Sequence, residues 1–163
     1  NCGIGGDRTQ HVLWRLDHGN IDGLDRPAAP GPSVPRVVVL MIGTNNSDGN
    51  DNPAREIADG IIAIVTRLRV KLPHTKVLLL GIFPRGEKSD AQREKNAEAS
   101  RLASSMATGK MIHYLDIGPK FLQPDGTLSK EIMPDLLHLS PQGYQIWAEA
   151  IESKLKEMLE EKP

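Results

Sequence analysis

The sequence predicts an α/β fold of three layers, in which a parallel sheet lies between helices. Short apolar runs that end at Gly or Pro are typical of strands buried on both faces. Segments with apolar residues three and four positions apart lie between these runs and predict amphipathic helices. Because strands and helices alternate, we expect right-handed crossovers between parallel strands. At 163 residues the chain has the length of about one domain, so we expect residues 1–163 to form a single domain.

The first segment combines a glycine-rich turn with a short helix. Gly3-Ile4-Gly5-Gly6-Asp7 precedes a predicted helix. The apolar face of that helix consists of Val12, Leu13 and Leu16. Residues 25–36 follow and carry four of the 12 prolines. Because proline removes a backbone donor and fixes φ, this stretch predicts an irregular surface loop inserted within the domain.

A strand and a helix are predicted next. The run 37–42 (VVVLMI) predicts a strand buried on both faces, and Gly43 ends it. A helix is predicted over 54–71, because Leu72-Pro73 cannot continue it. Its apolar stripe consists of Ile57, Ile61, Ile64 and Leu68.

Two further strands enclose another helix. The run 76–83 (KVLLLGIF) predicts a second buried strand, which ends at Pro84. Residues 90–106 are rich in Ala, Glu, Lys and Arg and predict a helix with much of its surface exposed. Residues 111–115 predict a third, shorter strand that ends at Asp116.

The final helix has a clear start signal. Ser140 is a favourable N-cap, and Pro141 is favourable at the first helical position. Its predicted apolar face consists of Tyr144, Trp147, Ile151, Leu155 and Met158. In folds of this class, functional side chains gather in the loops that follow the carboxyl ends of strands. We therefore expect the site residues to lie in those loops.

Charge and cysteine content exclude several classes of function. The chain has 20 Lys+Arg and 21 Asp+Glu, a net charge of −1, whereas a polyanion-binding surface needs a concentrated cationic face. The single cysteine, Cys2, excludes an intrachain disulfide framework and a Cys-rich zinc site. The longest apolar runs, 37–42 and 77–83, are too short to span a bilayer. We therefore expect no nucleic-acid partner and no membrane span.

Asp135 stands three residues before His138, just ahead of the final helix. At this spacing the carboxylate can hold the imidazole Nδ1–H, which fixes the tautomer and leaves Nε2 as a general base. The alternative is an N-cap or a surface hydrogen bond. The other histidines have no comparable carboxylate and are expected to be structural or solvated: His11, His18, His74 and His113.

Two glycine-containing turns are further candidates. Gly43-Thr44-Asn45-Asn46 is either a simple turn or a turn that presents a side-chain amide donor to an oxyanion. The glycines before the first helix could bring backbone N–H groups close to an anion. They do not form the dinucleotide-binding fingerprint, because Arg8 replaces its third glycine, and no Gly-Lys-Ser/Thr phosphate loop occurs.

One set of oxygen-bearing residues has the spacing of a calcium loop. It consists of Asp48, Asn50, Asn52 and Asp59. Pro53 replaces the glycine that such a loop needs, and the last ligand is not Glu. The composition of the loop therefore argues against a calcium site, and we expect no metal centre.

These elements, in this order, resemble the SGNH (GDSL-type) hydrolases, which are esterases and lipases named for a Ser, a Gly, an Asn and a His in successive blocks. The similar segments are GIGGD, GTNN and DLLHLS. The chain is most similar to the branch that contains the catalytic subunits of brain-type platelet-activating-factor acetylhydrolase, through NCGIGGDRTQHVLWRL, LGIFPRGEKSDAQREKN and DLLHLSPQGY. Apart from residues 25–36 the resemblance covers essentially the whole chain, and it implies a three-layer, flavodoxin-like fold.

The resemblance also implies roles for individual residues. Gly6 would supply a backbone N–H and Asn45 a side-chain donor to an oxyanion hole. His138 would be the general base, and Asp135 would orient it. Arg85, in Phe-Pro-Arg-Gly after the second strand, matches a family position but receives no chemical role. The resemblance implies no metal and no organic cofactor.

The family's nucleophilic serine has no counterpart here. In the family it follows Gly-Asp at the end of a strand, and none of the nine serines does so; Ser47 lies near Asn45 but in the wrong loop. In the family's fold that first strand is central, and without it backbone groups and apolar side chains would be exposed. We therefore expect an N-terminal segment outside this chain to supply the strand and the serine, and a second family strand near Asn1.

The predicted function is that of a serine ester hydrolase, an acyl- or acetylesterase with a Ser-His-Asp triad. The resemblance favours short acyl groups on a lipid, sugar or small alcohol. One alternative is an inactive α/β binding module of the same fold that has lost its nucleophile. Another is a nucleotide-binding flavodoxin-like domain, but the lack of a phosphate-binding loop in the sequence argues against it. The expected partners are an acylated small molecule and the N-terminal fragment of the same protein. A homodimer is compatible with the resemblance, although the sequence shows no diagnostic interface patch.

Overall fold

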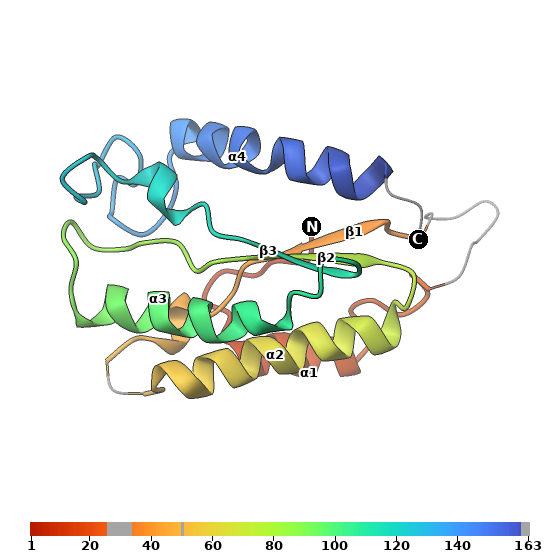
Figure 1. Cartoon of the computed structure of the whole chain (residues 1–163). Coiled ribbons are helices and arrows are strands. Elements are labelled where there is room, and N and C mark those ends of the chain that lie inside the picture. The colour runs from red at the N-terminus through yellow and green to blue at the C-terminus, as the bar shows by residue number, and fades with distance from the viewer. Residues whose placement is uncertain (26–33, 50, 161–163) are drawn as a thin grey trace.

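The computed structural model describes residues 1–25, 34–49 and 51–160. It shows an α/β fold in which a parallel three-stranded sheet separates one long helix from three others (Figure 1). The strands, in their spatial order, are β1 (Val37–Leu40), β2 (Lys76–Leu80) and β3 (Ile112–Leu115). The predicted α/β class and the predicted parallel sheet are therefore confirmed.

The register of the sheet makes β2 the central strand. Val37 of β1 pairs with Lys76 of β2, and Val77 of β2 pairs with Ile112 of β3. All five residues of β2 are buried. The segment Val77–Leu80 contains no polar residue, because helices cover both faces of the strand and a neighbouring strand lies on each side.

Within the described residues, four helices surround the sheet: α1 (Thr9–Asp17), α2 (Ala54–Lys71), α3 (Ala91–Ala103) and α4 (Pro141–Glu160). Short 3-10 turns are η1 (Thr44–Asn46), η2 (Ser104–Met106) and η3 (Gly118–Phe121). α2 has the predicted bounds, and α3 with η2 covers the predicted helical range after Asp90. Ser140 caps α4 as predicted, since its Oγ accepts a hydrogen bond from the Gly143 N–H at 3.2 Å. None of these helices, within the described residues, is long and apolar enough to cross a lipid bilayer.

The hydrophobic core has two parts, one on each face of the sheet. On one face, α1, α2 and α3 pack against Val77 and Leu79 of β2. On the other face, α4 and the segment that contains η3 pack against Leu78 and Leu80. Alternate residues of β2 thus belong to opposite parts of the core, as the pleat of a strand requires.

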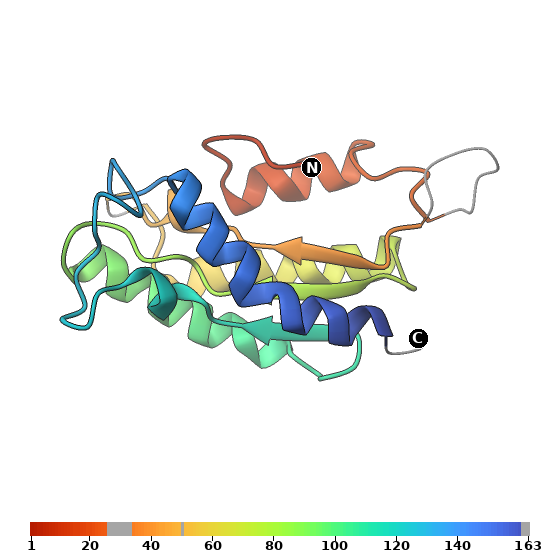
Figure 2. The same ribbon diagram turned by 90° about the horizontal axis from the view of Figure 1, so that it is seen from above.

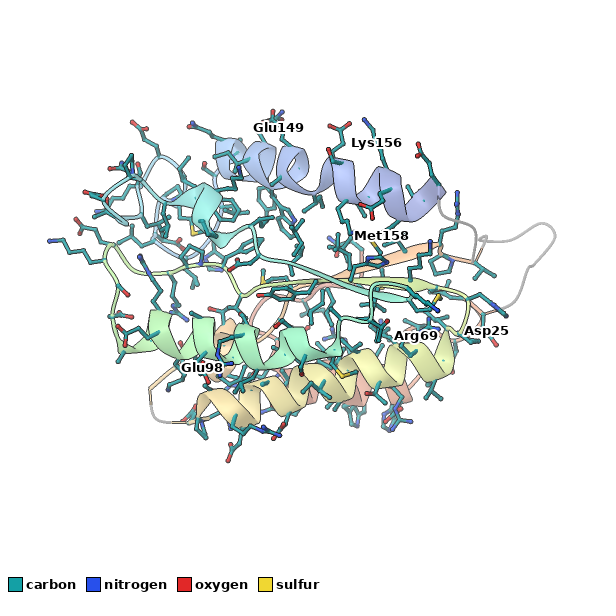
Figure 3. The ribbon with its side chains drawn as sticks, viewed as in Figure 1. Asp25, Arg69, Glu98, Glu149, Lys156 and Met158 are labelled. Carbon is teal, nitrogen blue, oxygen red and sulfur yellow. The ribbon has the colours of Figure 1, made fainter. Side chains whose placement is uncertain are left out.

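α4 is amphipathic, and its apolar face is largely the predicted one. Met158 points from α4 toward the sheet and is 1% exposed, whereas Glu149 and Lys156 point away from the sheet (Figure 3). Most of the remaining predicted face packs on the core: Trp147, Ile151 and Leu155. Tyr144 is the exception at 58% exposed, because α4 begins beyond the ends of the strands (Figure 2).

β1 differs from its prediction. The run 37–42 was expected to be buried on both faces, but three of the four β1 residues are half-buried and Val39 is 37% exposed. The strand expected near Asn1 is also absent, because residues 1–8 form a turn and irregular backbone. Glycines weaken a strand, and this segment forms no ladder. Among the described residues, β1 therefore has a neighbouring strand on one side only, and its other edge lies open beside α1.

Two predictions fall partly on residues that the structure does not describe. Residues 26–33, which make up most of the predicted proline-rich loop 25–36, lie outside the described residues. Asn50, one of the residues at calcium-loop spacing, lies outside them as well. The other three residues of that set belong to the loop between β1 and α2 or to α2 itself.

Candidate active site

The segments that follow the strands gather at one end of the molecule. Because the strands are parallel, their carboxyl ends point the same way, and segments 41–53, 81–90 and 116–140 all leave the sheet at this end (Figure 2). The turn before α1 and the start of α4 lie at this end too. All four predicted site residues belong to these segments. Ligands bind at this end in open α/β sheets.

The turn before α1 carries Gly6. The Asp7 N–H donates to the Ile4 carbonyl at 3.3 Å across this turn. Gly6 has a φ of +79°, a left-handed conformation that glycine adopts without a steric penalty. Gly6 is exposed, and its N–H donates to none of the described residues. This N–H is therefore available to a ligand.

Asp7 fixes the conformation of this turn through Arg15. The two carboxylate oxygens of Asp7 accept from Arg15 at 2.6 and 2.7 Å, and both side chains are largely buried. The hydrogen bond from Arg15 lowers the pKa of Asp7 below its usual value, against the opposing effect of burial. Arg15 also donates to the Cys2 carbonyl at 3.3 Å. The sequence did not indicate this pair; the only signal was a spacing of eight residues, about two helical turns.

Asn45 lies in η1, directly after β1. Gly43, the residue before η1, has a φ of +125°, and a Cβ added to it would lie 2.7 Å from the Cδ1 atom of Ile82. Glycine is therefore required for this close turn. The Asn45 Nδ2 donates to the Asp7 carbonyl at 2.9 Å, which brings Asn45 beside the turn that holds Gly6. The second N–H of the same amide remains available to a ligand.

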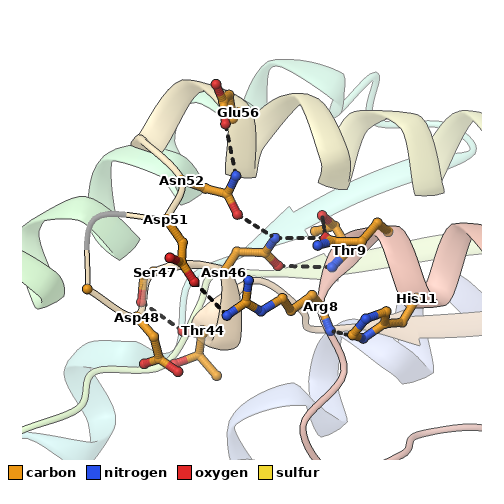
Figure 4. A network of polar contacts seen from close by, with 12 residues as sticks. Arg8, Thr9, His11, Thr44, Asn46, Ser47, Asp48, Asp51, Asn52 and Glu56 are labelled. Atoms are coloured by element: carbon orange, nitrogen blue, oxygen red, sulfur yellow. Dashed lines mark hydrogen bonds and ion pairs between the residues drawn. The ribbon is translucent and has the colours of Figure 1, made fainter.

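The neighbouring residue, Asn46, ties the loop after β1 to two helices (Figure 4). Its Oδ1 accepts from the Thr9 N–H of α1 at 2.9 Å, and Asn46 is 2% exposed. Its Nδ2 donates to Asn52 at 3.1 Å, and Asn52 donates to Glu56 of α2 at 2.9 Å. The two asparagines of GTNN thus differ: Asn46 holds the scaffold, and Asn45 keeps a free donor.

Asp135 and His138 form the predicted hydrogen bond. His138 Nδ1 lies 2.7 Å from Asp135 Oδ2. Asp135 Oδ1 accepts from the backbone N–H groups of Leu137 at 3.0 Å and His138 at 2.7 Å. Leu136 has a φ of +61°, a conformation that is rare for leucine and that curls the chain around the carboxylate. The His138 side chain is 78% exposed, so its Nε2 is accessible to a reactant.

Hydrogen bonds keep the Asp135 carboxyl group ionised. They lower its pKa from the usual 3.8 to about 2, with the His138 N–H as the largest cause and the imidazole as the second. Bonds donated to a carboxylate favour the charged form, because protonation weakens them. Asp135 is therefore a carboxylate at any ordinary pH, the state in which it can orient an imidazole and stabilise an imidazolium.

The loop after β2 connects the other segments. Arg85 Nη1 donates to the Thr44 carbonyl at 3.3 Å and to Asp48 at 2.9 Å. The Gly86 N–H donates to the Leu136 carbonyl at 2.9 Å. The structure thus links the loop after β1 both to the turn before α1 and to the loop before α4. The sequence assigned no role to Arg85, and the only signal was its position in a motif directly after a buried strand.

None of the described serines makes a hydrogen bond with His138, whose side-chain partner is Asp135. Ser47, the serine nearest to Asn45 in the sequence, is 0% exposed, and its hydroxyl donates to the Thr44 carbonyl at 2.7 Å. Ser47 is therefore a structural residue. Ser33 lies outside the described residues.

The loop around Asp48 uses its carboxylates in ion pairs. Asp48 pairs with Arg85 at 2.9 Å, and Asp51 pairs with Arg8 at 2.7 Å. Within residues 1–25, 34–49 and 51–160, no group of three His, Cys, Asp or Glu side chains could hold a metal ion. Arginine side chains neutralise the two loop carboxylates.

The remaining histidines have the structural or solvated positions that were predicted. His11 Nδ1 accepts from the Arg8 N–H at 3.2 Å at the start of α1. The His18 ring stacks on Trp14 with centroids 4.1 Å apart. His113 is 4% exposed, and His74 is exposed beyond the end of α2.

Comparisons with known proteins identify the family of the chain. Residues 1–146 match the GDSL-like Lipase/Acylhydrolase family. The chain is 38% identical over 164 residues to platelet-activating factor acetylhydrolase IB subunit alpha2 of Rattus norvegicus, and the match covers 100% of this chain and 66% of that protein. It is 39% identical over 160 residues to subunit alpha1 of Homo sapiens, with 98% and 64% covered.

The chain thus spans just under two thirds of the length of these relatives. Among solved structures, a carbohydrate esterase family 3 protein from Talaromyces cellulolyticus has a TM-score of 0.68 at 20% identity, over 99% of this chain and 72% of that chain. This similarity shows that the two proteins share the flavodoxin-like fold. From the match to the family model and the identity to these subunits, it follows that the chain belongs to the GDSL-like lipase/acylhydrolase family.

Proposed function

We propose that the protein is a serine ester hydrolase that transfers an acyl group first to a serine and then to water. The hydrogen-bonded pair of Asp135 and His138 carries this proposal, because it is a general base with its orienting carboxylate. The pair lies at the end of the sheet that also holds the free donors of Gly6 and Asn45. Membership of an acylhydrolase family supports the same chemistry.

In the proposed reaction, His138 Nε2 removes the proton of the serine hydroxyl while the serine oxygen attacks the ester carbonyl carbon. The carbonyl electrons move onto oxygen, and Asp135 stabilises the imidazolium that forms. The imidazolium then gives its proton to the departing alcohol. Water then attacks the carbonyl carbon of the acyl-enzyme while His138 removes a proton from it. The second tetrahedral intermediate collapses, releases the acid and returns the proton to the serine oxygen.

The oxyanion of each tetrahedral intermediate would accept hydrogen bonds from Gly6 N–H and Asn45 Nδ2. The bond from Asn45 Nδ2 to the Asp7 carbonyl supports this role, because it fixes the direction of the amide before the substrate arrives. Donors that are already oriented stabilise a developing charge without reorganisation.

We further propose that the serine follows a strand, outside this chain, that pairs with the open edge of β1. A groove of about 620 Å³ runs along this edge, and apolar side chains such as Val39, Leu16 and Leu68 line it. Trp147 lies in the same lining, and its indole N–H is buried without a partner among the described residues. An added strand would bury the apolar surface, and its backbone could pair with β1.

The acyl group is proposed to be short, with acetyl favoured. The relatives named above are acetylhydrolase subunits, and the structural neighbour is a carbohydrate esterase. These names support an acetyl ester of a lipid, a sugar or a small alcohol. The lining of the groove beside β1 does not distinguish among these three kinds of ester, because the proposed strand would fill the groove.

The second candidate is a binding module of the same fold that does not catalyse hydrolysis. The absence of a hydrogen bond between His138 and any described serine is the observation that favours it. The two candidates differ in one measurable property: only the hydrolase reacts covalently through a serine.

The test is labelling of the whole natural protein with a serine-directed fluorophosphonate, followed by peptide mapping. We expect one labelled serine outside residues 1–163, and loss of labelling in His138→Ala. Arg101→Ala serves as the control, because Arg101 forms an exposed ion pair with Glu98 on α3. Label on a serine within 1–163, or ester hydrolysis by a single species of 17.9 kDa, would overturn the placement of the nucleophile. A folded protein that neither labels nor hydrolyses would instead be the binding module.

A further inference from the structure

Arg85 and Gly86 lie between the two halves of the proposed site. They follow β2, the central strand, at the end of the sheet where the other site segments gather. The loop after β1 lies on one side of them and the loop before α4 on the other, as their hydrogen bonds show.

The Arg85 side chain holds the loop after β1. Its Nη1 donates to the Thr44 carbonyl at 3.3 Å, and this carbonyl belongs to the peptide group that joins Thr44 to Asn45. The same nitrogen pairs with Asp48 at 2.9 Å, and Gln92 donates to the same Asp48 oxygen at 2.9 Å. The Arg85 side chain is only 19% exposed. Arg85 therefore fixes the peptide group directly before the proposed oxyanion donor.

The Gly86 backbone holds the loop before α4. Its N–H donates to the Leu136 carbonyl at 2.9 Å, two residues before His138. Gly86 has a φ of +73° and Leu136 a φ of +61°, so both partners of this bond are in the left-handed region. A residue other than glycine at position 86 would be strained in this conformation. Gly86 therefore fixes the segment that carries the proposed base.

Arg93 of α3 makes the connecting segment rigid. Its guanidinium donates to the carbonyls of Arg85 at 3.0 Å and Gly86 at 2.5 Å, and to Gly126 at 2.9 Å. Arg93 is 8% exposed, so these bonds are shielded from water. Three charge-assisted bonds to carbonyl groups hold the backbone of the segment in place.

We propose that Arg85 is a positioning residue that couples the oxyanion donor to the base, because its side chain holds the Asn45 peptide while its own segment holds the His138 loop. This inference rests on the proposed function, which assigns Asn45 and His138 their chemistry. The groups that act on the carbonyl oxygen and on the serine must keep a fixed separation. A displacement of about 1 Å between such groups can lower a rate about a hundredfold.

The test uses the full-length natural protein with three substitutions: Arg85→Ala, Arg85→Lys and the control Arg101→Ala. We expect Arg85→Ala to lower kcat for p-nitrophenyl acetate about tenfold to a hundredfold, with KM changed less than about twofold. Arg85→Lys should restore part of the loss, because an ammonium group can also donate to Asp48 and Thr44 but lacks the planar guanidinium that holds the donor in a fixed direction. Arg101→Ala should leave both constants unchanged.

Hydrogen–deuterium exchange gives a second readout that does not depend on activity. In Arg85→Ala we expect faster exchange in residues 44–48, whereas residues 136–138 and α2 should not change, because the Gly86 N–H and Arg93 still hold the loop before α4. An unchanged kcat, or a rise in KM alone, would overturn the inference, and the rise would make Arg85 a substrate-binding residue. Faster exchange across the whole molecule would equally overturn it, because it would show a general structural role.

Failure of the proposed function can be recognised separately. If the unsubstituted protein hydrolyses no ester, the proposed function fails, and the exchange measurement alone decides whether Arg85 couples the two loops. If hydrolysis is present and residues 44–48 do not respond to Arg85→Ala, the proposed function stands and the coupling is wrong.

Discussion

Asn45 uses one amide group for two purposes. One Nδ2 hydrogen is donated to the Asp7 carbonyl at 2.9 Å, and the other is the proposed donor to the oxyanion. Asn46, the next residue, is 2% exposed and ties α1 to the loop that leads to α2. The two residues have the same side chain and are neighbours, so their substitutions form a matched pair.

Asn45→Ala should lower kcat about a hundredfold to a thousandfold with little change in KM, because it removes one oxyanion donor. Asn46→Ala should instead lower the free energy of unfolding by about 1–3 kcal/mol, because it leaves buried partners without a hydrogen bond. Steady-state kinetics and urea unfolding of the natural full-length protein measure the two effects. A normal kcat in Asn45→Ala would remove Asn45 from the mechanism.

The Asp135 carboxyl group should titrate near pH 2, and a ¹³C NMR titration of its side chain measures this value directly. Because this pKa is depressed in the folded protein, the carboxylate stabilises its loop above about pH 4, and this contribution is lost as the pH falls toward 2. His138→Ala should raise the Asp135 pKa only in part, because the imidazole bond is lost while the His138 N–H remains. A pKa of about 4 in the unsubstituted protein would contradict the hydrogen-bonded arrangement.

At the scale of elements, α4 depends on residues from other parts of the chain at its carboxyl end. Its last turn contains no basic residue that could bind the final carbonyl groups. Lys76 of β2, 5% exposed, donates to the Met158 carbonyl at 2.8 Å, and Arg36 donates to the Leu159 carbonyl. Cations are favourable at a helix carboxyl end, because of the partial negative charge there.

Lys76→Met should lower the free energy of unfolding by about 1–3 kcal/mol, because it removes a charge-assisted bond to a buried carbonyl while keeping most of the side-chain volume. Lys156→Met is the control: Lys156 forms an exposed i,i+4 pair with Glu152, and its loss should change stability by less than about 0.5 kcal/mol. Urea unfolding compares the two variants. Equal effects would show that the Lys76 bond contributes nothing particular to α4.

At the scale of the whole molecule, the sheet is asymmetric. β2 has a neighbour on each side and is buried throughout, whereas β1 has one neighbour and Val39 is 37% exposed. The open edge borders the apolar groove beside α1. Exposed apolar strand edges are sites of association in proteins.

We expect residues 1–163 alone to bind the dye 8-anilinonaphthalene-1-sulfonate in this groove, and the full-length protein to bind much less. The reason is that the proposed serine-bearing strand would cover the same apolar surface. Dye fluorescence at equal protein concentration makes the comparison. Val39→Lys in the isolated chain should reduce the signal, whereas Val70→Lys, on an exposed position of α2, should not. Equal fluorescence from both proteins would argue against the added strand.

Short-range patterns predicted the elements well, for a physical reason. The stripe of α2 and the cap at Ser140 depend on residues within one or two turns of each other, so their spacing alone encodes the structure. The bond between Asp135 and His138 was predictable on the same ground, because three residues separate them. The burial of β1, the strand near Asn1 and the burial of Tyr144 were predicted wrongly, since strand pairing and burial depend on neighbours that are distant in the sequence.

The sequence by itself determined the order of strands and helices, the parallel sheet and the residues from which a site could form. Tertiary structure alone decided how those residues meet. Asn45 reaches Asp7 across 38 positions, and Arg85 reaches Thr44 across 41. Such contacts leave no periodic trace in a sequence, because they depend on which loops the parallel strands bring to the same end of the sheet. The resemblance predicted an open sheet edge, but only the folded chain shows that β1 forms it, because strand pairing joins residues that are distant in the sequence.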